Sequence, residues 1–257
     1  MPDRVLILSD LHCGHRSGLT PPRYQGGEPK YVRSQDEKWR WFEEALIEAA
    51  PWNKVVWVGD LVDGLGVKNS SEIILADLNQ QINCAVDIIE TVGCPKNLFL
   101  YGTMTHTATK DGLEIERIIA QQINGKENPM IYSQAWFKLG KHVIDARHAP
   151  ACGSGVPHTR ANPIMRERMA NEQWHMKGYQ PLADIYLRGH LHYKFMAGSP
   201  GTWQGWNLPA LQTPKTKYGR RLSNTVDVGI SILEENDKWP IYEIYEAPIR
   251  QEEVLNW

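Results

Sequence analysis

The sequence predicts an α/β fold with two mixed β-sheets, and three observations support that prediction. The first half of the chain alternates short apolar runs with longer amphipathic segments, whereas the second half is richer in paired runs joined by turns. Acidic and histidine residues recur where the apolar runs end. With 257 residues, 42% of them hydrophobic, the chain is long enough for one well-buried core, so we expect a single domain over residues 1–257.

The first half of the chain alternates predicted strands and helices. The predicted strands are short buried runs: RVLILS (4–9), KVVWVGD (54–60) and NLFLYGT (97–103). The predicted helices carry apolar residues at helical spacing: SQDEKWRWFEEALIEAA (34–50), a segment from about Ser71 to Val92, and DGLEIERIIAQQIN (111–124). This βαβαβα order predicts a parallel sheet with crossover helices.

The second half of the chain changes to hairpins. Two segments each predict a pair of strands around a tight turn: QAWFKLGKHVIDARHA (134–149) and VDVGISILEENDKWPIYEIYE (226–246). Between them, ANPIMRERMANEQWHM (161–176) predicts a helix and ADIYLRGH (183–190) a further strand. A second sheet accommodates these strands more naturally than one doubly wound sheet.

Composition excludes several classes of protein. A formal net charge of −2 argues against a strongly basic nucleic-acid surface over the whole protein, although a local basic face is compatible with it. The four cysteines form no CxxC pair and no secretory leader opens the chain, so we expect reduced thiols in a cytoplasmic protein. No apolar run approaches the roughly 20 residues that span a bilayer, so we expect no membrane partner.

Five of the predicted strands are followed by side chains that bind metal ions. These are Asp10 and His12 after the first strand, Asp60 and Asp63 after the second, His106 after the third, and His148, His190 and His192 after two strands of the second half. Strand ends in α/β proteins meet at one sheet edge, where sites are built. Imidazole and carboxylate suit Mn, Fe, Zn and similar ions, and at least six such side chains exceed what one tetrahedral zinc needs. Two ions that share a bridging aspartate would use them all.

Each motif taken alone has an ordinary structural explanation. DLH after a strand can cap a helix, GD is a common turn, and a lone His148 more often packs than binds a metal. GHLH is more specific, because both of its imidazoles can reach one site. The joint occurrence of these motifs, each after a buried strand, favours the metal site.

These motifs resemble those of the calcineurin-like metallophosphoesterase superfamily, from residue 4 to about residue 192. The matching motifs are DLH, GDLVD, a third loop that contains Gly-Thr, a strand-ending histidine, and GHLH. The resemblance implies a four-layer αββα sandwich of two mixed β-sheets flanked by helices, with a dinuclear metal centre between the sheets at the C-terminal strand ends. It implies that Asp10, His12, Asp60 and His192 hold one ion, and that Asp60, a third-loop residue, His148 and His190 hold the other.

The third loop departs from the family pattern. The family usually has Gly-Asn-His, whereas this chain has Gly102-Thr103-Met104-Thr105-His106. Thr103 takes the place of the Asn, and its hydroxyl is a poor ligand for the second ion. His106 arrives two residues late, so it can be the catalytic imidazole, a ligand of the second ion, or neither; we favour the catalytic role. The GTxxH loop also resembles uncharacterised phage and bacterial members, which suggests a phage-encoded protein.

Other residues are candidates for support or substrate contact. Asp63 is expected to orient a ligand or the loop rather than to bind the metal directly. His15 either contacts substrate or is a solvated loop residue. Cations and an aromatic that flank the last motifs suit phosphates beside bases: Arg160, Lys215, Lys217 and Tyr218.

The predicted activity is hydrolysis of a phosphate ester by in-line attack of a metal-bridging hydroxide. The substrate is a phosphodiester or a phosphomonoester, with a nucleotide or nucleic-acid ester preferred. Mn²⁺ is our first choice of metal, and Fe, Zn and Ni also suit the ligands. Two alternatives stay open: a nuclease that acts on DNA or RNA ends or single strands, and a non-catalytic scaffold of the same fold. Nothing in the sequence encodes the oligomeric state.

Overall fold

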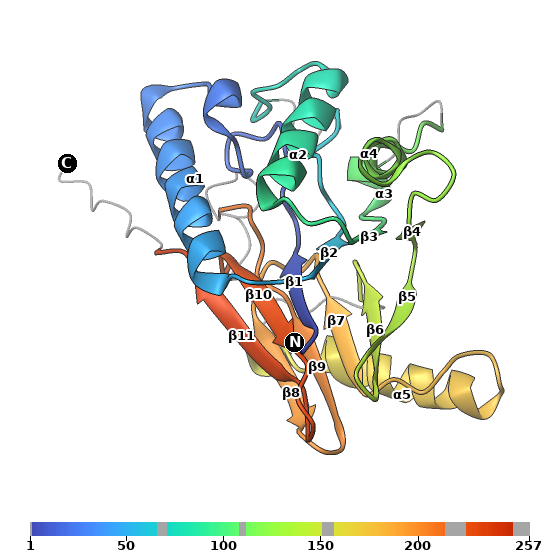
Figure 1. The fold of residues 1–257 in the computed structure, drawn as a ribbon. Helices are drawn as coiled ribbons and strands as arrows, with labels where there is room; N and C mark the ends of the chain where they lie inside the picture. Colours follow the sequence, from blue (N-terminus) through green and yellow to red (C-terminus); the bar gives the residue numbers. More distant parts are fainter. Residues whose placement is uncertain (1, 66–70, 108–111, 151–156, 214–224, 249–257) are drawn as a thin grey trace.

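Two stacked β-sheets with helices on their outer faces make up the computed structural model (Figure 1). It describes residues 2–65, 71–107, 112–150, 157–213 and 225–248. The first sheet has six strands in the order β11-β10-β1-β2-β3-β4, and the second has five in the order β5-β6-β7-β9-β8. Both sheets mix parallel and antiparallel pairs, so the predicted fold class is confirmed.

The first sheet is built around parallel strands from the first half of the chain. Its strands are β1 (Arg4–Leu8), β2 (Lys54–Val58), β3 (Asn97–Leu100), β4 (Ile131–Tyr132), β10 (Gly229–Glu234) and β11 (Ile241–Glu246). β1 to β4 are parallel, and the β10–β11 hairpin adds two antiparallel strands beside β1. Because β1, β2 and β3 run in one direction, the loops that follow them lie at the same edge.

The second sheet comes from the second half of the chain. Its strands are β5 (Ala135–Leu139), β6 (His142–Arg147), β7 (Ile185–Arg188), β8 (Phe195–Ser199) and β9 (Trp203–Asn207). β6, β7 and β9 are parallel, while β5 and β8 pair antiparallel at the two edges. The loops after β6 and β7 therefore also share one edge.

Helices cover the outer face of each sheet. They are α1 (Pro29–Ala49), α2 (Leu78–Val92), α3 (Met104–Thr107), α4 (Ile115–Asn124) and α5 (Asn162–Met176), with short 3₁₀ turns at Pro22–Tyr24 and Pro157–Thr159. In Figure 1, α1, α2 and α4 lie on the side of the first sheet and α5 on the side of the second. On α5, Asn171 accepts a hydrogen bond from Tyr186 of β7 (2.9 Å), which ties this helix to the second sheet.

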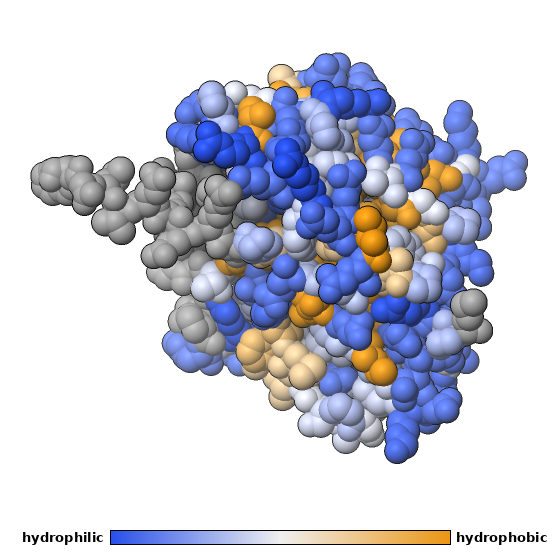
Figure 2. Space-filling view, turned by 60° about the vertical axis from the view of Figure 1, so that its left-hand side comes forward, coloured by the Kyte–Doolittle hydropathy of each residue, from blue (hydrophilic) through white to orange (hydrophobic). Residues whose placement is uncertain are grey.

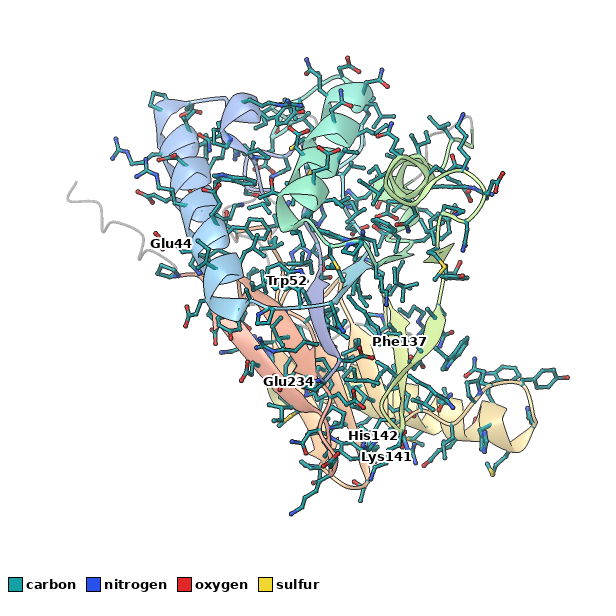
Figure 3. The ribbon with its side chains drawn as sticks, viewed as in Figure 1. Glu44, Trp52, Phe137, Lys141, His142 and Glu234 are labelled. Atoms are coloured by element: carbon teal, nitrogen blue, oxygen red, sulfur yellow. The ribbon has the colours of Figure 1, made fainter. Side chains whose placement is uncertain are left out.

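Burial on both faces explains why β1 is a continuous apolar run. Leu6 and Leu8 pack into the core under the outer helices, whereas Val5 and Ile7 pack into the core between the sheets. Phe137 of β5 also packs against the core between the sheets, and Figure 3 labels it. The successive side chains of one strand thus fill two hydrophobic cores.

Two of the expected helices begin at other residues in the structure, and one hairpin was not predicted. The second helix begins at Leu78 rather than near Ser71, because Asp77 caps it by accepting a hydrogen bond from the amide of Asn79 (2.9 Å). The first helix begins earlier than expected, at Pro29, a residue favoured in the first turn. The β8–β9 hairpin was not predicted, since β8 (FMAGS) is mostly exposed and contains glycine.

The face of the molecule drawn in Figure 2 is mostly polar. Figure 2 shows a largely hydrophilic face on which hydrophobic side chains form small, separate groups. Among the described residues, no helix combines the length and the apolar character needed to cross a membrane.

Candidate metal centre

The loops that follow four parallel strands bring together the predicted metal ligands. The loop after β1 carries Asp10 and His12, and the loop after β2 carries Asp60. The loop after β6 carries His148, and the loop after β7 carries His190 and His192. Within the described residues, these side chains form two groups that could hold a metal ion: Asp10, His12 and His192, and Asp60, His148 and His190. A third such group joins His12 to two further expected residues, Asp63 and His106.

The first group gathers around the Asp10 carboxylate. Asp10 Oδ1 lies 3.0 Å from His192 Nε2 and 3.9 Å from His12 Nε2. The other carboxylate oxygen, Oδ2, accepts hydrogen bonds from the Ser9 hydroxyl and from the backbone amide of His190 (3.0 Å). Asp10 thus has one oxygen held by the protein and one directed at two imidazoles.

The second group gathers around Asp60, which also reaches the first group. Asp60 Oδ2 lies 3.1 Å from His148 Nε2 and 4.0 Å from His12 Nε2. Asp10 Oδ1 lies 3.9 Å from His148 Nε2, so the two groups adjoin. A carboxylate between two sets of imidazoles is the arrangement by which one aspartate can bridge two ions.

Two buried ring nitrogens indicate that the centre fits metal ions. In His12, Nδ1 lies 3.0 Å from Asp63 Oδ1, and in His148, Nδ1 lies 2.6 Å from the Val58 carbonyl. The Nε2 atom of each ring is buried and makes no hydrogen bond of acceptable geometry, although Asp60 lies close to both. A buried polar atom without a partner costs about 1–3 kcal/mol, and coordination of a cation would satisfy it. The residues present therefore fit divalent ions with nitrogen and oxygen ligands.

The backbone of the centre lies in an unusual conformation. Left-handed backbone angles (φ from 48° to 68°) occur at five candidate ligands: Asp10, His12, Asp60, His190 and His192. Met130 is the other non-glycine residue of the described chain with a positive φ. This conformation costs on the order of 1 kcal/mol or more for each residue and is concentrated at functional sites. It turns the ligands out of the strand direction and into the centre.

The two sheets meet closely at the centre. A Cβ atom on Gly189, which precedes His190, would lie 2.2 Å from Ser9 Oγ and 3.0 Å from Asp10 Oδ2. Only glycine allows the loop after β7 to approach the loop after β1 this closely. The first half and the second half of the chain thereby contribute to one site.

Electrostatic interactions keep the carboxylates of the centre ionised. Burial raises the pKa of Asp10, but the charges of His192 and His148 outweigh it and hold the pKa below its usual range. Burial also raises the pKa of Asp60, and His148 likewise outweighs it and lowers the value. For His148, burial lowers the pKa, but Asp60 and Asp10 dominate and raise it to about 10. The metal-free centre therefore holds a proton on His148, which a metal ion has to displace.

The third loop places Thr103 and His106 beside the centre. The backbone amide of Thr103 donates to Asp60 Oδ1 (2.7 Å), and its hydroxyl donates to the same carboxylate at 3.1 and 3.2 Å. His106, on α3, donates from Nδ1 to the Asp63 carbonyl (2.6 Å), and its ring centroid lies 4.8 Å from that of His12. The bonded Nδ1 leaves Nε2 as the nitrogen that can carry a proton or bind an ion. Both roles expected for His106 are compatible with this position.

Asp63 contacts a candidate ligand of the centre, whereas His15 bonds to residues outside it. Asp63 contacts His12 Nδ1 and so makes the contact that an orienting carboxylate needs. His15 is 1% exposed, and its Nδ1 accepts a hydrogen bond from the backbone amide of Ser17 (3.1 Å). Its Nε2 lies 3.8 Å from Glu72. This burial fits neither a substrate contact nor a solvated loop residue.

Of the four cationic and aromatic residues expected beside the substrate, the structure describes Arg160. Its guanidinium carbon lies 4.7 Å from the ring centroid of Tyr193, the residue after His192, and one of its NH₂ groups donates to Thr225. Lys215, Lys217 and Tyr218 lie outside the described residues. Arg160 thus belongs to the neighbourhood of the second sheet's ligand loop.

Sequence reasoning missed two buried ionisable residues on elements that carry or adjoin the ligand loops. Glu116 of α4 is fully buried, and burial together with the Asp60 charge raises its pKa to about 8. Arg188, the last residue of β7, is also fully buried and pairs with Asp145 (3.0 Å) and Glu167 (2.8 Å). The sequence carried one signal for Glu116, because an acid stands beside Ile115 on the apolar face of a predicted helix.

The fold and the centre together define a two-sheet α/β protein whose strand-end loops form clusters of aspartate and histidine suited to divalent metal ions. This matches the architecture that the resemblance to the calcineurin-like metallophosphoesterase superfamily implies. The phage-type subgroup stays a prediction.

Comparisons with known proteins found similar solved structures. No family model matches the sequence, and no curated protein matches it. Similar solved structures include Vps29 from Chaetomium thermophilum (10% identity, TM-score 0.47, 96% of each chain covered). They also include Vps29 from Entamoeba histolytica complexed with zinc (13%, 0.44, 95% of this chain and 98% of that one). A third is an uncharacterised protein, a predicted phosphoesterase, from Streptococcus pneumoniae (13%, 0.41, 95% and 89%).

Proposed function

We propose that this chain is a metal-dependent phosphoesterase with two divalent ions held between its sheets. The observation that supports the proposal is the meeting of two ligand groups at Asp60, with the buried Nε2 atom of His12 left without a hydrogen bond and that of His148 facing Asp60 Oδ2 at 3.1 Å. When bound, such ions polarise a phosphoryl oxygen and make water acidic enough to supply a nucleophile near neutral pH. Asp10, His12, Asp60 and His192 would hold one ion, and Asp60, His148 and His190 the other, with Thr103 beside Asp60.

The protein's own residues would orient the ligands and the leaving group. Asp63 fixes the ring of His12 through Nδ1, and the Val58 carbonyl fixes the ring of His148. His106 holds its Nδ1 proton against the Asp63 carbonyl, so Nε2 is the atom that would deliver a proton to the leaving oxygen. Asp63 thus anchors both His12 and His106, and links ligand geometry to the proton donor.

The preferred substrate is a phosphodiester of nucleotide or nucleic-acid type. Arg160 supports this preference, because it places a guanidinium beside the ligand loop, where a cation suits a phosphate. The Tyr193 ring beneath it is buried and does not stack on a base. Comparison of bis(p-nitrophenyl) phosphate, p-nitrophenyl phosphate and a short single-stranded oligonucleotide as substrates would separate a diesterase, a monoesterase and a nuclease. Hydrolysis of the monoester alone would contradict the diester preference.

Metal titration tests the proposal directly. Calorimetric titration of metal-free protein with Mn²⁺ should give close to two ions per chain. Binding should release protons and tighten as pH rises toward 10, because His148 (pKa about 10) is protonated in the metal-free centre and must lose its proton to bind. A chain that binds at most one ion under saturating Mn²⁺ or Zn²⁺ would refute the dinuclear centre. A chain that binds two ions but hydrolyses no phosphate ester would favour the scaffold alternative.

His106→Ala separates the two roles left open for this residue. As the proton donor, His106 should matter most for esters with poor leaving groups, so turnover of an alkyl phosphodiester should fall about 100-fold while a nitrophenyl ester is largely spared. Metal content should stay unchanged. His175→Ala is the matched control, because His175 lies exposed on α5. Loss of one ion would make His106 a ligand instead, and unchanged rates on every substrate would exclude both roles.

A further inference from the structure

We propose that Glu116 is a positioning residue that holds the loops after β2 and β3 in the arrangement that metal binding requires. The inference deepens the proposed function and rests on it. Glu116 lies on α4, outside the candidate ligand groups, and its side chain is fully buried. Its two carboxylate oxygens accept hydrogen bonds from the backbone amides of Leu61 (3.0 Å) and Gly102 (2.7 Å).

The two amides belong to the loop that carries Asp60 and to the loop that donates a hydrogen bond to its carboxylate. Leu61 follows Asp60 directly, so its amide lies in the peptide bond that Asp60 begins. Gly102 precedes Thr103, whose own amide donates to Asp60 Oδ1 (2.7 Å). Consecutive amides of the third loop therefore bond to two different carboxylates: Gly102 to Glu116 and Thr103 to Asp60. Through this arrangement, Glu116 couples the position of the third loop to that of the shared carboxylate.

The chemistry of the contact requires a carboxylate of this length. Both oxygens accept from backbone N–H groups, so Glu116 uses its two acceptors on two separate loops. A glutamine would keep one acceptor and turn its NH₂ group toward the other amide, which breaks one of the two bonds. The buried N–H that faces the NH₂ group would lack a partner.

A purely structural role for Glu116 predicts something different. A residue that only fills the core under α4 would affect the melting temperature and leave the loop amides and the metal affinity unchanged. Glu114, at the start of the same helix, provides the matched control. It is exposed and accepts hydrogen bonds from the hydroxyl of Tyr101 (3.1 Å), the first residue after β3, and from Arg117 (3.4 Å), whereas the amides of Leu61 and Gly102 donate to Glu116.

The first measurement uses the metal-free protein. Amide hydrogen exchange should be about tenfold faster at Leu61 and Gly102 in Glu116→Gln than in the wild type, because each amide loses or weakens a hydrogen bond. Exchange in Glu114→Gln should match the wild type at both amides. Should Glu116→Gln fail to fold, Glu116→Asp replaces it, since a side chain one methylene shorter cannot reach both amides and predicts the same change in smaller size.

The second measurement uses Mn²⁺ alone as the probe. The Mn²⁺ dissociation constant should rise about 10- to 100-fold in Glu116→Gln, the size expected for residues that orient metal ligands. In the Mn²⁺-loaded enzyme, kcat should fall while KM changes little. Unchanged exchange at both amides, or unchanged Mn²⁺ affinity, would overturn the positioning role. A wild type that hydrolyses no phosphate ester, with the exchange and affinity differences intact, would refute the proposed function and leave the positioning role standing.

Discussion

Asp60→Asn should reduce phosphoester hydrolysis by about a thousandfold or more, the largest loss expected for any single ligand change. Asp60 Oδ2 faces His12 and His148, and Oδ1 accepts from the amide of Thr103, so one carboxylate serves both ligand groups and the third loop. A neutral amide offsets the charge of two divalent ions poorly. Its NH₂ group would also face either the Thr103 amide or the imidazoles.

Steady-state turnover and metal content of the purified variant test this expectation together. Asp36→Asn is the matched control, because Asp36 is a partly exposed aspartate on α1 whose partner is Arg40. The control should keep wild-type turnover and two ions. If Asp60→Asn retains wild-type turnover of a phosphodiester and binds two ions, Asp60 is not the shared ligand.

Gly102→Ala should destabilise the protein by about 3 kcal/mol and disrupt metal binding. A Cβ atom at this position would lie 2.1 Å from Asp60 Oδ1 and 2.3 Å from the Asp60 backbone nitrogen. Since the second of these atoms belongs to the backbone of a buried loop, no side-chain rotation can relieve the contact. Either the loop after β3 or Asp60 itself has to move.

Thermal unfolding should report this change as a fall in melting temperature of about 6–12 °C. Gly26→Ala is the control, because nothing lies within 4 Å of a Cβ atom built there and its φ is not positive. The control should melt within about 2 °C of the wild type. Equal melting temperatures and equal Mn²⁺ affinities for Gly102→Ala and the wild type would show that the loop after β3 does not pack against Asp60 as described.

The sequence predicted the fold class well because the strands of both cores are strongly apolar. β1, β2 and β3 are buried on both faces, so each appears as a short continuous apolar run that no polar side chain interrupts. The β8–β9 hairpin escaped prediction because β8 is mostly exposed and its large apolar residues, Phe195 and Met196, are followed by Ala-Gly-Ser. The predicted second sheet therefore lacked two strands, β8 and β9.

By itself, the sequence determined which residue types stand at the strand ends, and therefore that aspartate and histidine could meet there. Only the tertiary structure decided which of them do. His15 follows the DLH motif by only a few residues, yet the chain turns it into the protein, where it accepts a hydrogen bond from Ser17. Glu116 is distant from every motif in sequence, yet α4 brings its carboxylate to the loop after Asp60. The physical reason is that a motif specifies chemistry along the chain, whereas burial and hydrogen-bond partners depend on which loops the packing of two sheets and their helices brings together.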